Sequence, residues 1–373
     1  MLQSATAPLS ELIIQKIKQE GPIPFKDFME HALYYPELGY YTSASEKIGT
    51  EGDYYTCPTF TKLFGQMLGK QLEEMWALLG KGEFTIVEYG AGTGRLCYDL
   101  LEYLKNNAEF YEKLRYCIIE KSGFMRGKEQ DLLSEKVQWY GSITDIGTFS
   151  GCVLSNEVVD NFAVHLVEMQ EELMEIFVDH EQDFKEVLKP ASAELNDYIK
   201  QLNVKLEKGS RMEINLEATQ WIKEIAGALG KGFVLTIDYG YLADELCYKR
   251  NGTLICYNQH KRNTSFYSYI GKQDITAHVN FSALKHWGEK QGLSCCGYTD
   301  QANFLRALGL AKHLRAIEEN LRGKSLSEKE KFFLLHTLLI DMGSKFKVLI
   351  QQKGFEKVDL SGMMFSGMTE FRI

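Results

Sequence analysis

The apolar positions of the N-terminal part of the chain follow helical spacing. An amphipathic helix is expected from Leu9, a Gly-Pro break follows at 21–24, and a second helix begins near Phe25. Beyond an aromatic, turn-rich stretch, apolar residues at helical spacing over 59–79 indicate a long amphipathic helix. No strand of a parallel sheet is evident here, so residues 1–80 are predicted to form an N-terminal helical cap.

Residues 81–373 alternate short β-rich runs with helical sequence, as parallel βαβ units do. The runs predicted as strands are 84–87, 116–119, 137–140, 152–155, 233–237, 293–298 and 346–350. This rhythm predicts a doubly wound, Rossmann-like α/β sheet of about seven strands. The connections at about 160–215 and 239–290 exceed ordinary βα loops of about 2–6 residues. They are predicted to be large insertions in the α/β domain that carry specificity.

The composition is that of an ordinary globular protein, and its charge bears on the partner. Of the 373 residues 45% are hydrophobic and 25% charged, and the length allows about two domains or one domain with insertions. The net charge of -9 disfavours a nucleic-acid partner, because proteins that grip a phosphate backbone usually present excess Lys and Arg. Two basic pairs, at 249–250 and 261–262, are interpreted as solvated surface.

Cysteine spacing argues against a metal site. The eight cysteines form no C-x-x-C pair and several lie in apolar runs, so free thiols, no metal and a reducing compartment are expected. The N-terminus has neither the apolar stretch of a signal peptide nor an arginine-rich transit segment. The longest apolar stretch, 332–340, is broken by two polar residues and is shorter than the roughly 20 residues of a membrane span. A cytoplasmic protein without a membrane span is predicted.

A glycine-rich turn follows the first predicted strand. Its sequence, Glu88-Tyr-Gly-Ala-Gly-Thr-Gly94, opens a helix, where bare backbone and N–H donors can meet a ligand. The spacing is G-x-G-x-G, whereas the dinucleotide fingerprint is G-x-G-x-x-G. It resembles motif I of class I methyltransferases, which predicts that Glu88, Gly90, Ala91, Gly92 and Gly94 bind S-adenosylmethionine. A tight turn without a ligand is the alternative.

Two further segments are candidates for the adenosyl part of this cofactor. Glu120 ends the second strand, where its carboxylate could accept hydrogen bonds from both ribose hydroxyls. Ser142 and Ile143 follow the third strand, where this fold brackets an adenine ring, and Asp145 could accept from the exocyclic amine. The alternative for Glu120 is a solvated glutamate at the end of a strand.

Polar residues follow the fourth and fifth strands at the mouth of the predicted sheet, where doubly wound folds bind ligands. Asn156 is predicted to contact the cofactor, and Glu157 and Asp160 to orient or deprotonate an amine or guanidine. Asp238 ends the fifth strand and His278 closes an insertion, so both are candidates for the acceptor pocket, with His278 as a general base. Helix capping by Asn156 and Glu157, and a structural histidine at 278, are the alternatives.

The chain closely resembles the MidA family from about residue 21 to at least 281. The segments that carry the resemblance are Gly21–Met29, Ala32–Tyr41, Gly52–Thr56, Phe64-Gly65, Val87-Glu88, Asn156-Glu157, Asp160, Ile237–Gly240 and Asp274–Phe281. Mitochondrial members of that family are S-adenosylmethionine-dependent protein arginine methyltransferases that symmetrically dimethylate a respiratory complex I subunit and support its assembly. The resemblance implies a class I methyltransferase fold and the same cofactor, a protein substrate, and a respiratory complex subunit as partner; a homodimer is compatible with it.

The chain departs from the family pattern at three places. Ala91-Gly-Thr-Gly94 stands where the family has Pro-Gly-Arg-Gly or a similar run, Cys57 replaces the serine of Thr-Ser-Pro, and Gln66 replaces the glutamate after Phe-Gly. The first change moves the chain nearer the general methyltransferase pattern, and the lost charge at Gln66 bears on the identity of the acceptor. Methylation of a small molecule or RNA, a non-catalytic cofactor-binding assembly factor, and a nicotinamide or flavin oxidoreductase are the competing functions.

Overall fold

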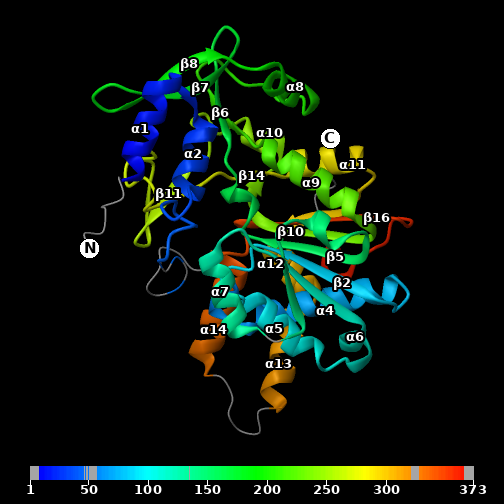
Figure 1. The fold of residues 1–373 in the computed structure, drawn as a ribbon. Helices are drawn as coiled ribbons and strands as arrows, with labels where there is room; N and C mark the ends of the chain where they lie inside the picture. The colour runs from blue at the N-terminus through cyan, green and yellow to red at the C-terminus, as the bar shows by residue number, and fades with distance from the viewer. Residues whose placement is uncertain are drawn as a thin grey trace, which may run out of the picture. The chain divides into compact units, whose positions relative to one another are not determined.

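The chain folds as two compact units, and each unit is built from three separate segments of the sequence (Figure 1). The computed structural model describes residues 8–45, 47, 49, 57–133, 135–320 and 327–364. Unit 1 consists of Met1–Tyr54, Val159–Gln220 and Tyr241–Ala283, and unit 2 of Tyr55–Val158, Trp221–Gly240 and Leu284–Ile373.

Unit 2 is built on a mostly parallel sheet with the strand order β15-β16-β10-β5-β2-β3-β4. The strands are β2 (Phe84–Tyr89), β3 (Leu114–Ile119), β4 (Val137–Tyr140), β5 (Phe149–Asn156), β10 (Leu229–Tyr241), β15 (Ser294–Asp300) and β16 (Phe346–Lys353). The run from β4 to β10 is parallel, and β16 is antiparallel to both β10 and β15. Mostly apolar, buried runs make the central strands β2, β3, β5 and β10, because both faces of a parallel sheet are covered. The predicted doubly wound α/β sheet is confirmed.

Helices lie on both faces of this sheet, with α4 and α5 on one face and α9 on the other (Figure 1). The helices of this part of the chain are α3 (Cys57–Phe60), α4 (Lys62–Leu78), α5 (Arg95–Leu104), α6 (Ala108–Lys113), α7 (Gly123–Leu132), α9 (Leu216–Ala228), α11 (Phe281–Lys290), α12 (Gln301–Ala307), α13 (Leu310–Asn320) and α14 (Glu328–His336). Short helical turns are η1 (Ile143–Ile146), η3 (Thr337–Asp341) and η4 (Ser361–Met363).

Helix α4 shows why the chain changes unit near residue 55 and not near the predicted boundary at 80. Thr61 caps the helix by accepting a hydrogen bond from the Leu63 N–H. A Cβ on Gly65 would lie 2.8 Å from the Cβ of Asp99, so the absence of a side chain lets α4 pack closely on α5. The apolar face of α4 is therefore part of the core of unit 2.

Unit 1 joins the N-terminal segment to the two predicted insertions. Its elements are α1 (Leu9–Glu20), β1 (Ile23–Pro24), α2 (Phe25–Tyr34), η2 (Val159–Asn161), β6 (His165–Met169), β7 (Leu173–His180), β8 (Phe184–Pro190), α8 (Ala193–Gln201), β9 (Arg211–Ile214), α10 (Ala243–Leu246), β11 (Ile255–Asn258), β12 (Lys261–Asn263), β13 (Asp274–Thr276) and β14 (Val279–Asn280). An antiparallel sheet runs β1-β7-β6-β9 with β8 on β7, and a smaller sheet runs β12-β11-β13. Helices α1 and α2 pack on β7, as Figure 1 shows, and Ile23 pairs with Val178.

Candidate cofactor and acceptor site

The glycine turn between β2 and α5 has a backbone that other residues rarely adopt. Gly90, Gly92 and Gly94 have φ angles of 58°, 59° and 74°, all in the left-handed region. The Gly94 N–H donates to the carbonyl of Ala91 at 2.9 Å, which closes the turn. A Cβ on Gly90 would also lie 3.1 Å from Cγ2 of Val158. The turn therefore presents bare backbone at the carboxyl end of β2.

Glu88 lies on β2 just before this turn and is buried in unit 2, with 2% of its surface exposed. The hydroxyl of Tyr116 donates to Glu88 Oε2 at 2.6 Å. Burial raises the pKa of Glu88 to about 7, against the lowering effect of the tyrosine, and the charge of Glu120 raises it further. Its carboxyl is thus held inside the sheet by the neighbouring strand.

Glu120 follows β3, the strand beside β2 in the sheet. Its Oε1 accepts the backbone N–H of Ser122 at 2.7 Å, and Ser122 in turn caps α7. Burial raises the pKa of Glu120, while the N–H groups of Ser122 and Lys121 and the side chain of Glu129 lower it. A half-buried carboxylate is therefore fixed at the strand end, where a ribose diol could donate to it.

Glu129 is a residue of this site that the sequence analysis missed. It lies on α7, is fully buried, and accepts a hydrogen bond from Trp139 Nε1 at 2.7 Å. Burial and the charge of Glu120 raise the pKa of Glu129 to about 8. A glutamate in a charged helix gives no sequence signal of burial, and only the packing of α7 against the turn reveals it.

The residues predicted for the adenine side lie at η1. Ser142 Oγ accepts the N–H of Thr144 at 3.3 Å, and Asp145 Oδ2 accepts the N–H of Ser142 at 3.0 Å. Asp145 is thus engaged in capping this turn. Ile143 is buried, with 1% of its surface exposed. Contacts of Ser142 and Ile143 with an adenine ring stay a prediction.

Two acidic residues lie next to each other on neighbouring parallel strands, although Asp238 does not end its strand as predicted, because β10 continues to Tyr241. The register pairs Asn156, the last residue of β5, with Ile237 of β10, so Glu157 directly after β5 and Asp238 within β10 are the next residues along the chain. Glu157 has a φ of 55°, a strained conformation for a residue with a side chain, and its Oε1 accepts from Asn156 Nδ2 at 3.0 Å. Asp238 is fully buried and accepts the N–H groups of Val158 at 3.2 Å and of its own neighbour Tyr239 at 2.8 Å.

Asn156 offers a polar atom beside this pair. Its Oδ1 is buried and accepts no hydrogen bond from any residue that the structure describes. Such an acceptor is costly to bury unless a donor reaches it. An amino group of a bound ligand would supply that donor.

Asp160 and His278, the other predicted catalytic residues, lie in unit 1. Asp160 is buried at 4% exposure, and its carbonyl accepts the N–H of Ala277 at 2.9 Å. Burial lowers the pKa of His278 to about 4, and the nearby charges of Lys249 and Arg262 lower it further. His278 is therefore uncharged and weakly basic near neutral pH.

A cavity of about 470 Å³ opens beside the glycine turn, within unit 2. Thr93 of the turn and Arg95 of α5 line it together with Thr59, Thr61 and Lys62, which lie at or near the ends of α3 and α4. Hydroxyl and cationic groups of this kind can bind the carboxylate of a ligand. With the bare turn, Glu120 and the acceptor on Asn156, these residues fit an adenosyl amino acid cofactor.

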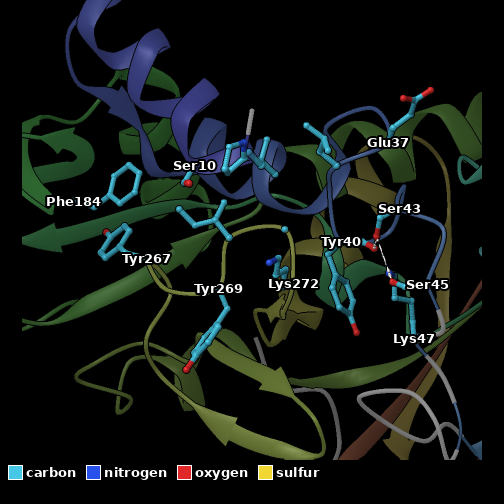
Figure 2. A pocket seen from close by; sticks show the side chains of 15 residues that line it. Ser10, Glu37, Tyr40, Ser43, Ser45, Lys47, Phe184, Tyr267, Tyr269 and Lys272 are labelled. Atoms are coloured by element: carbon cyan, nitrogen blue, oxygen red, sulfur yellow. Dashed lines mark hydrogen bonds between the residues drawn. The ribbon is translucent and has the colours of Figure 1, made fainter. Parts of the chain in front are cut away.

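A second cavity, of about 790 Å³, lies within unit 1. Figure 2 shows Phe184 and Tyr267 side by side at one end, and their rings stack at 6.2 Å. Lys47 lies at the other end, where its Nζ donates to Ser43 Oγ at 2.9 Å. The cavity is therefore lined from the N-terminal segment and both insertions, which shows how these parts of the chain form one unit.

All eight cysteines are free, and the described ranges contain no group of three His, Cys, Asp or Glu residues that could hold a metal. Within the same ranges no helix has the length and apolar character to cross a membrane. Gln66, which departs from the family pattern, contacts His313 Nε2 through its Oε1 at 2.9 Å. The predicted motif Gly52–Thr56 lies outside the described residues.

Comparison with known proteins places this site in context. A family model described as "Putative S-adenosyl-L-methionine-dependent methyltransferase" matches residues 67–299. A crystal structure of a protein from Burkholderia thailandensis bound to S-adenosyl-homocysteine is 29% identical, with a TM-score of 0.86 over 95% of this chain and 94% of that chain. A native crystal structure of a protein from the same organism is 28% identical, with a TM-score of 0.83 and the same coverage.

Two curated relatives carry a more specific name. The mitochondrial protein arginine methyltransferase NDUFAF7 homolog of Drosophila melanogaster is 27% identical over 94% of this chain and 86% of its own length. The mitochondrial protein arginine methyltransferase NDUFAF7 of Homo sapiens is 25% identical over 88% of this chain and 79% of its own length.

Proposed function

The chain belongs to the S-adenosyl-L-methionine-dependent methyltransferase family whose model covers more than half of it, and we propose that it methylates the guanidine of an arginine in a protein. S-adenosyl-L-methionine is its cofactor. The observation that carries the proposal is the acidic pair of Glu157, directly after β5, and Asp238, on the neighbouring strand β10, in a chain whose named relatives are protein arginine methyltransferases.

The residues of unit 2 divide into cofactor and acceptor groups. The backbone at Gly90, Gly92 and Gly94 would lie against the cofactor, and Glu120 would accept from its ribose hydroxyls. Asn156 Oδ1 would accept from its amino group. When bound, the cofactor supplies an electrophilic methyl group on a sulfonium sulfur.

The two residues of the acidic pair have different roles. Asp238 already accepts two backbone N–H groups, so it positions the chain after β5. Glu157 is half-buried and held in a strained conformation, so its carboxylate is the one that can meet a guanidinium. Arginine stays protonated in water, with a pKa above about 12, so a carboxylate that orients it and accepts its proton is required for transfer.

The proposal also covers the substrate protein and the cellular compartment. The resemblance to the MidA family supports a subunit of a respiratory complex as the substrate, and supports a role in the assembly of that complex. The free cysteines support a reducing compartment such as the cytoplasm. Asp160 and His278 lie in unit 1, where His278 is an uncharged hydrogen-bonding group near neutral pH, and a role of these two residues in binding the acceptor stays a prediction.

Labelled methyl transfer tests the proposal. The protein is incubated with S-adenosyl-L-methionine carrying a labelled methyl group and a lysate of cells that lack the protein, and the label is located by mass spectrometry. We expect methylated arginine in a small set of proteins. Glu157→Gln keeps the shape of the side chain without its charge, so it should bind S-adenosyl-homocysteine normally and transfer at least about tenfold less.

Label found only in small molecules, RNA or lysine would contradict the proposed acceptor. Equal transfer by wild type and Glu157→Gln would contradict the role of the carboxylate. Either result leaves the cofactor assignment in place, because binding of S-adenosyl-homocysteine is measured separately.

A further inference from the structure

The cavity of about 790 Å³ in unit 1 is built without any residue of the methyltransferase sheet. Its walls come from the start of α1, residues 37–45 with Lys47, Phe184 of β8 and the loop at 267–272. The N-terminal segment and both insertions thus meet around one hollow. Because loops held by a scaffold often carry binding residues, this cavity is a candidate binding site of unit 1 in its own right.

The walls of the cavity hold strained backbone conformations. Glu37 and Tyr269 have φ angles of 63° and 50°, in the left-handed region that residues with side chains rarely adopt. Gly271 lets its loop approach the opposite wall, because a Cβ there would lie 2.5 Å from the carbonyl oxygen of Leu38. The N–H of Lys272 donates to the carbonyl of Tyr269 at 2.7 Å and closes the loop. Strain of this kind gathers at binding sites, where the surrounding structure fixes the residues in place.

One end of the cavity is aromatic. Phe184 and Tyr267 stack with their ring centroids 6.2 Å apart, and the hydroxyl of Tyr267 donates to Glu186 at 3.1 Å. Tyr269 also lines the cavity, and 64% of its surface is exposed. Exposed tyrosines beside a hollow are typical of surfaces that bind another protein, since tyrosine contributes strongly to such interfaces. This end can therefore accept a ring or another apolar side chain of a partner.

The other end of the cavity carries positive charge. Lys47 is buried there, with 2% of its surface exposed. Its amino group donates to Ser43 and Ser45 and lies 4.9 Å from the ring centroid of Tyr40, so the position of the charge is fixed. Figure 2 shows Lys272 between this end and the aromatic end. Two lysines thus follow the aromatic rings along one cavity.

Two further features favour a negatively charged ligand. Helix α1 begins at the cavity, and its N-cap is Pro8, whose side chain cannot accept a hydrogen bond. The N-terminus of a helix of this length carries a partial positive charge. Glu37, the only carboxylate among the described residues that line the cavity, is exposed and points away from both lysines in Figure 2.

We propose that this cavity binds a segment of the protein substrate, with an apolar side chain against Phe184 and Tyr267 and a carboxylate near Lys47 and Lys272. The inference rests on the proposed function, because it takes the methyl acceptor to be a protein. A site for a small molecule buries most of its ligand, whereas the exposed ring of Tyr269 can contact a partner that continues outside the cavity. Such a segment raises the affinity for the substrate protein without touching the reacting atoms.

Selection from a library of random seven-residue peptides displayed on phage tests this inference, with the full chain as the target. We expect wild type to enrich peptides that combine Asp or Glu with Phe, Tyr, Trp or Leu. The most enriched peptide, made synthetically, should bind at least about tenfold more weakly to Lys272→Glu, where attraction becomes repulsion, and to Tyr269→Ala, which loses the exposed ring. Both side chains are exposed, so the variants should fold, which circular dichroism checks.

Two matched controls change the same residue types in unit 1 outside the cavity. Lys261→Glu reverses an exposed charge on β12, and Tyr248→Ala removes a tyrosine that is 86% exposed. Both should bind the peptide as wild type does. Labelled methyl transfer to lysate proteins gives a second measurement: Lys272→Glu and Tyr269→Ala should transfer less at low lysate concentration, approach wild type at high concentration, and bind S-adenosyl-homocysteine normally.

Failure to enrich any peptide, enrichment of peptides without a carboxylate, or equal binding by wild type and both cavity variants would overturn the inference. Methyl label found only in small molecules or RNA would instead overturn the proposed function on which the inference rests. The two failures are distinguishable, because peptide binding and the identity of the labelled acceptor are measured separately.

Discussion

Replacement of Glu88 by glutamine gives a pH-dependent change in stability that can be calculated from the structure. Glu88 lies in the central strand β2 with 2% of its surface exposed, and its pKa is raised from 4.5 to about 7. An acid whose pKa is raised in the folded state contributes stability that is present below pH 4.5 and is lost as the pH rises to 7. At about 1.4 kcal/mol for each pH unit, the wild type loses about 3 kcal/mol in this range.

Glutamine has the same shape and does not titrate, so Glu88→Gln lacks this loss. The hydrogen bond from Tyr116, which is 2.6 Å long in the wild type, can still be accepted by the amide oxygen. Any cost of placing the amide NH₂ group is the same at every pH. The free energy of unfolding of Glu88→Gln should therefore rise relative to wild type by about 3 kcal/mol between pH 4.5 and pH 7.5.

Urea unfolding followed by circular dichroism at several pH values measures this difference. Tyr116→Phe serves as the matched control, because it removes the hydrogen bond that lowers the pKa of Glu88. In that variant the loss of stability should extend to higher pH than in wild type. Parallel pH curves for wild type and Glu88→Gln, within about 0.5 kcal/mol, would refute the reasoning that burial raises this pKa.

Three further predictions concern Gly90, Glu157 and His278. Gly90→Ala should destabilise the protein by about 1–2 kcal/mol in thermal unfolding, because the φ of Gly90 is 58° and an added Cβ would meet Val158. Gly227→Ala in α9 has open space around the added Cβ and should stabilise the protein by about 1 kcal/mol. Equal effects of the two substitutions on stability would contradict the strain assigned to the turn. Glu157→Gly should leave the free energy of unfolding within about 1 kcal/mol of wild type, because relief of the left-handed backbone strain offsets the loss of the side chain. The same variant should not transfer a methyl group. Retained transfer would contradict the role of Glu157 in holding the acceptor. The ring of His278 should show no protonation above pH 5 by NMR, because its pKa is lowered to about 4, and titration near pH 6.5 would contradict its burial.

The sequence was sufficient to predict the sheet of unit 2. Apolar runs such as 84–87 and 116–119 lie in β2 and β3, because strands covered on both faces need continuous apolar sequence. The resemblance to the MidA family is likewise confirmed by the relatives of similar length. The strands of 160–215 were not predicted, because β8 and part of β7 are half-exposed and carry mixed polar sequence.

The candidate site was predictable only in part. The glycine turn has a spacing that requires left-handed backbone, and the structure has that backbone at Gly90, Gly92 and Gly94. The burial of Glu129, the capping role of Asp145 and the lowered pKa of His278 depend on residues distant in the sequence or on local turn geometry. Such effects arise from tertiary packing and leave no trace in residue spacing.

Calorimetric titration with S-adenosyl-homocysteine tests the central claim that unit 2 binds the adenosyl cofactor at the glycine turn and Glu120. Wild type and Glu157→Gln should bind it saturably, and Glu120→Ala should bind at least about tenfold more weakly, because the ribose loses a charged acceptor. NAD, titrated into the protein under the same conditions, should not bind. Absence of S-adenosyl-homocysteine binding at millimolar concentration, or undiminished binding by Glu120→Ala, would contradict the account.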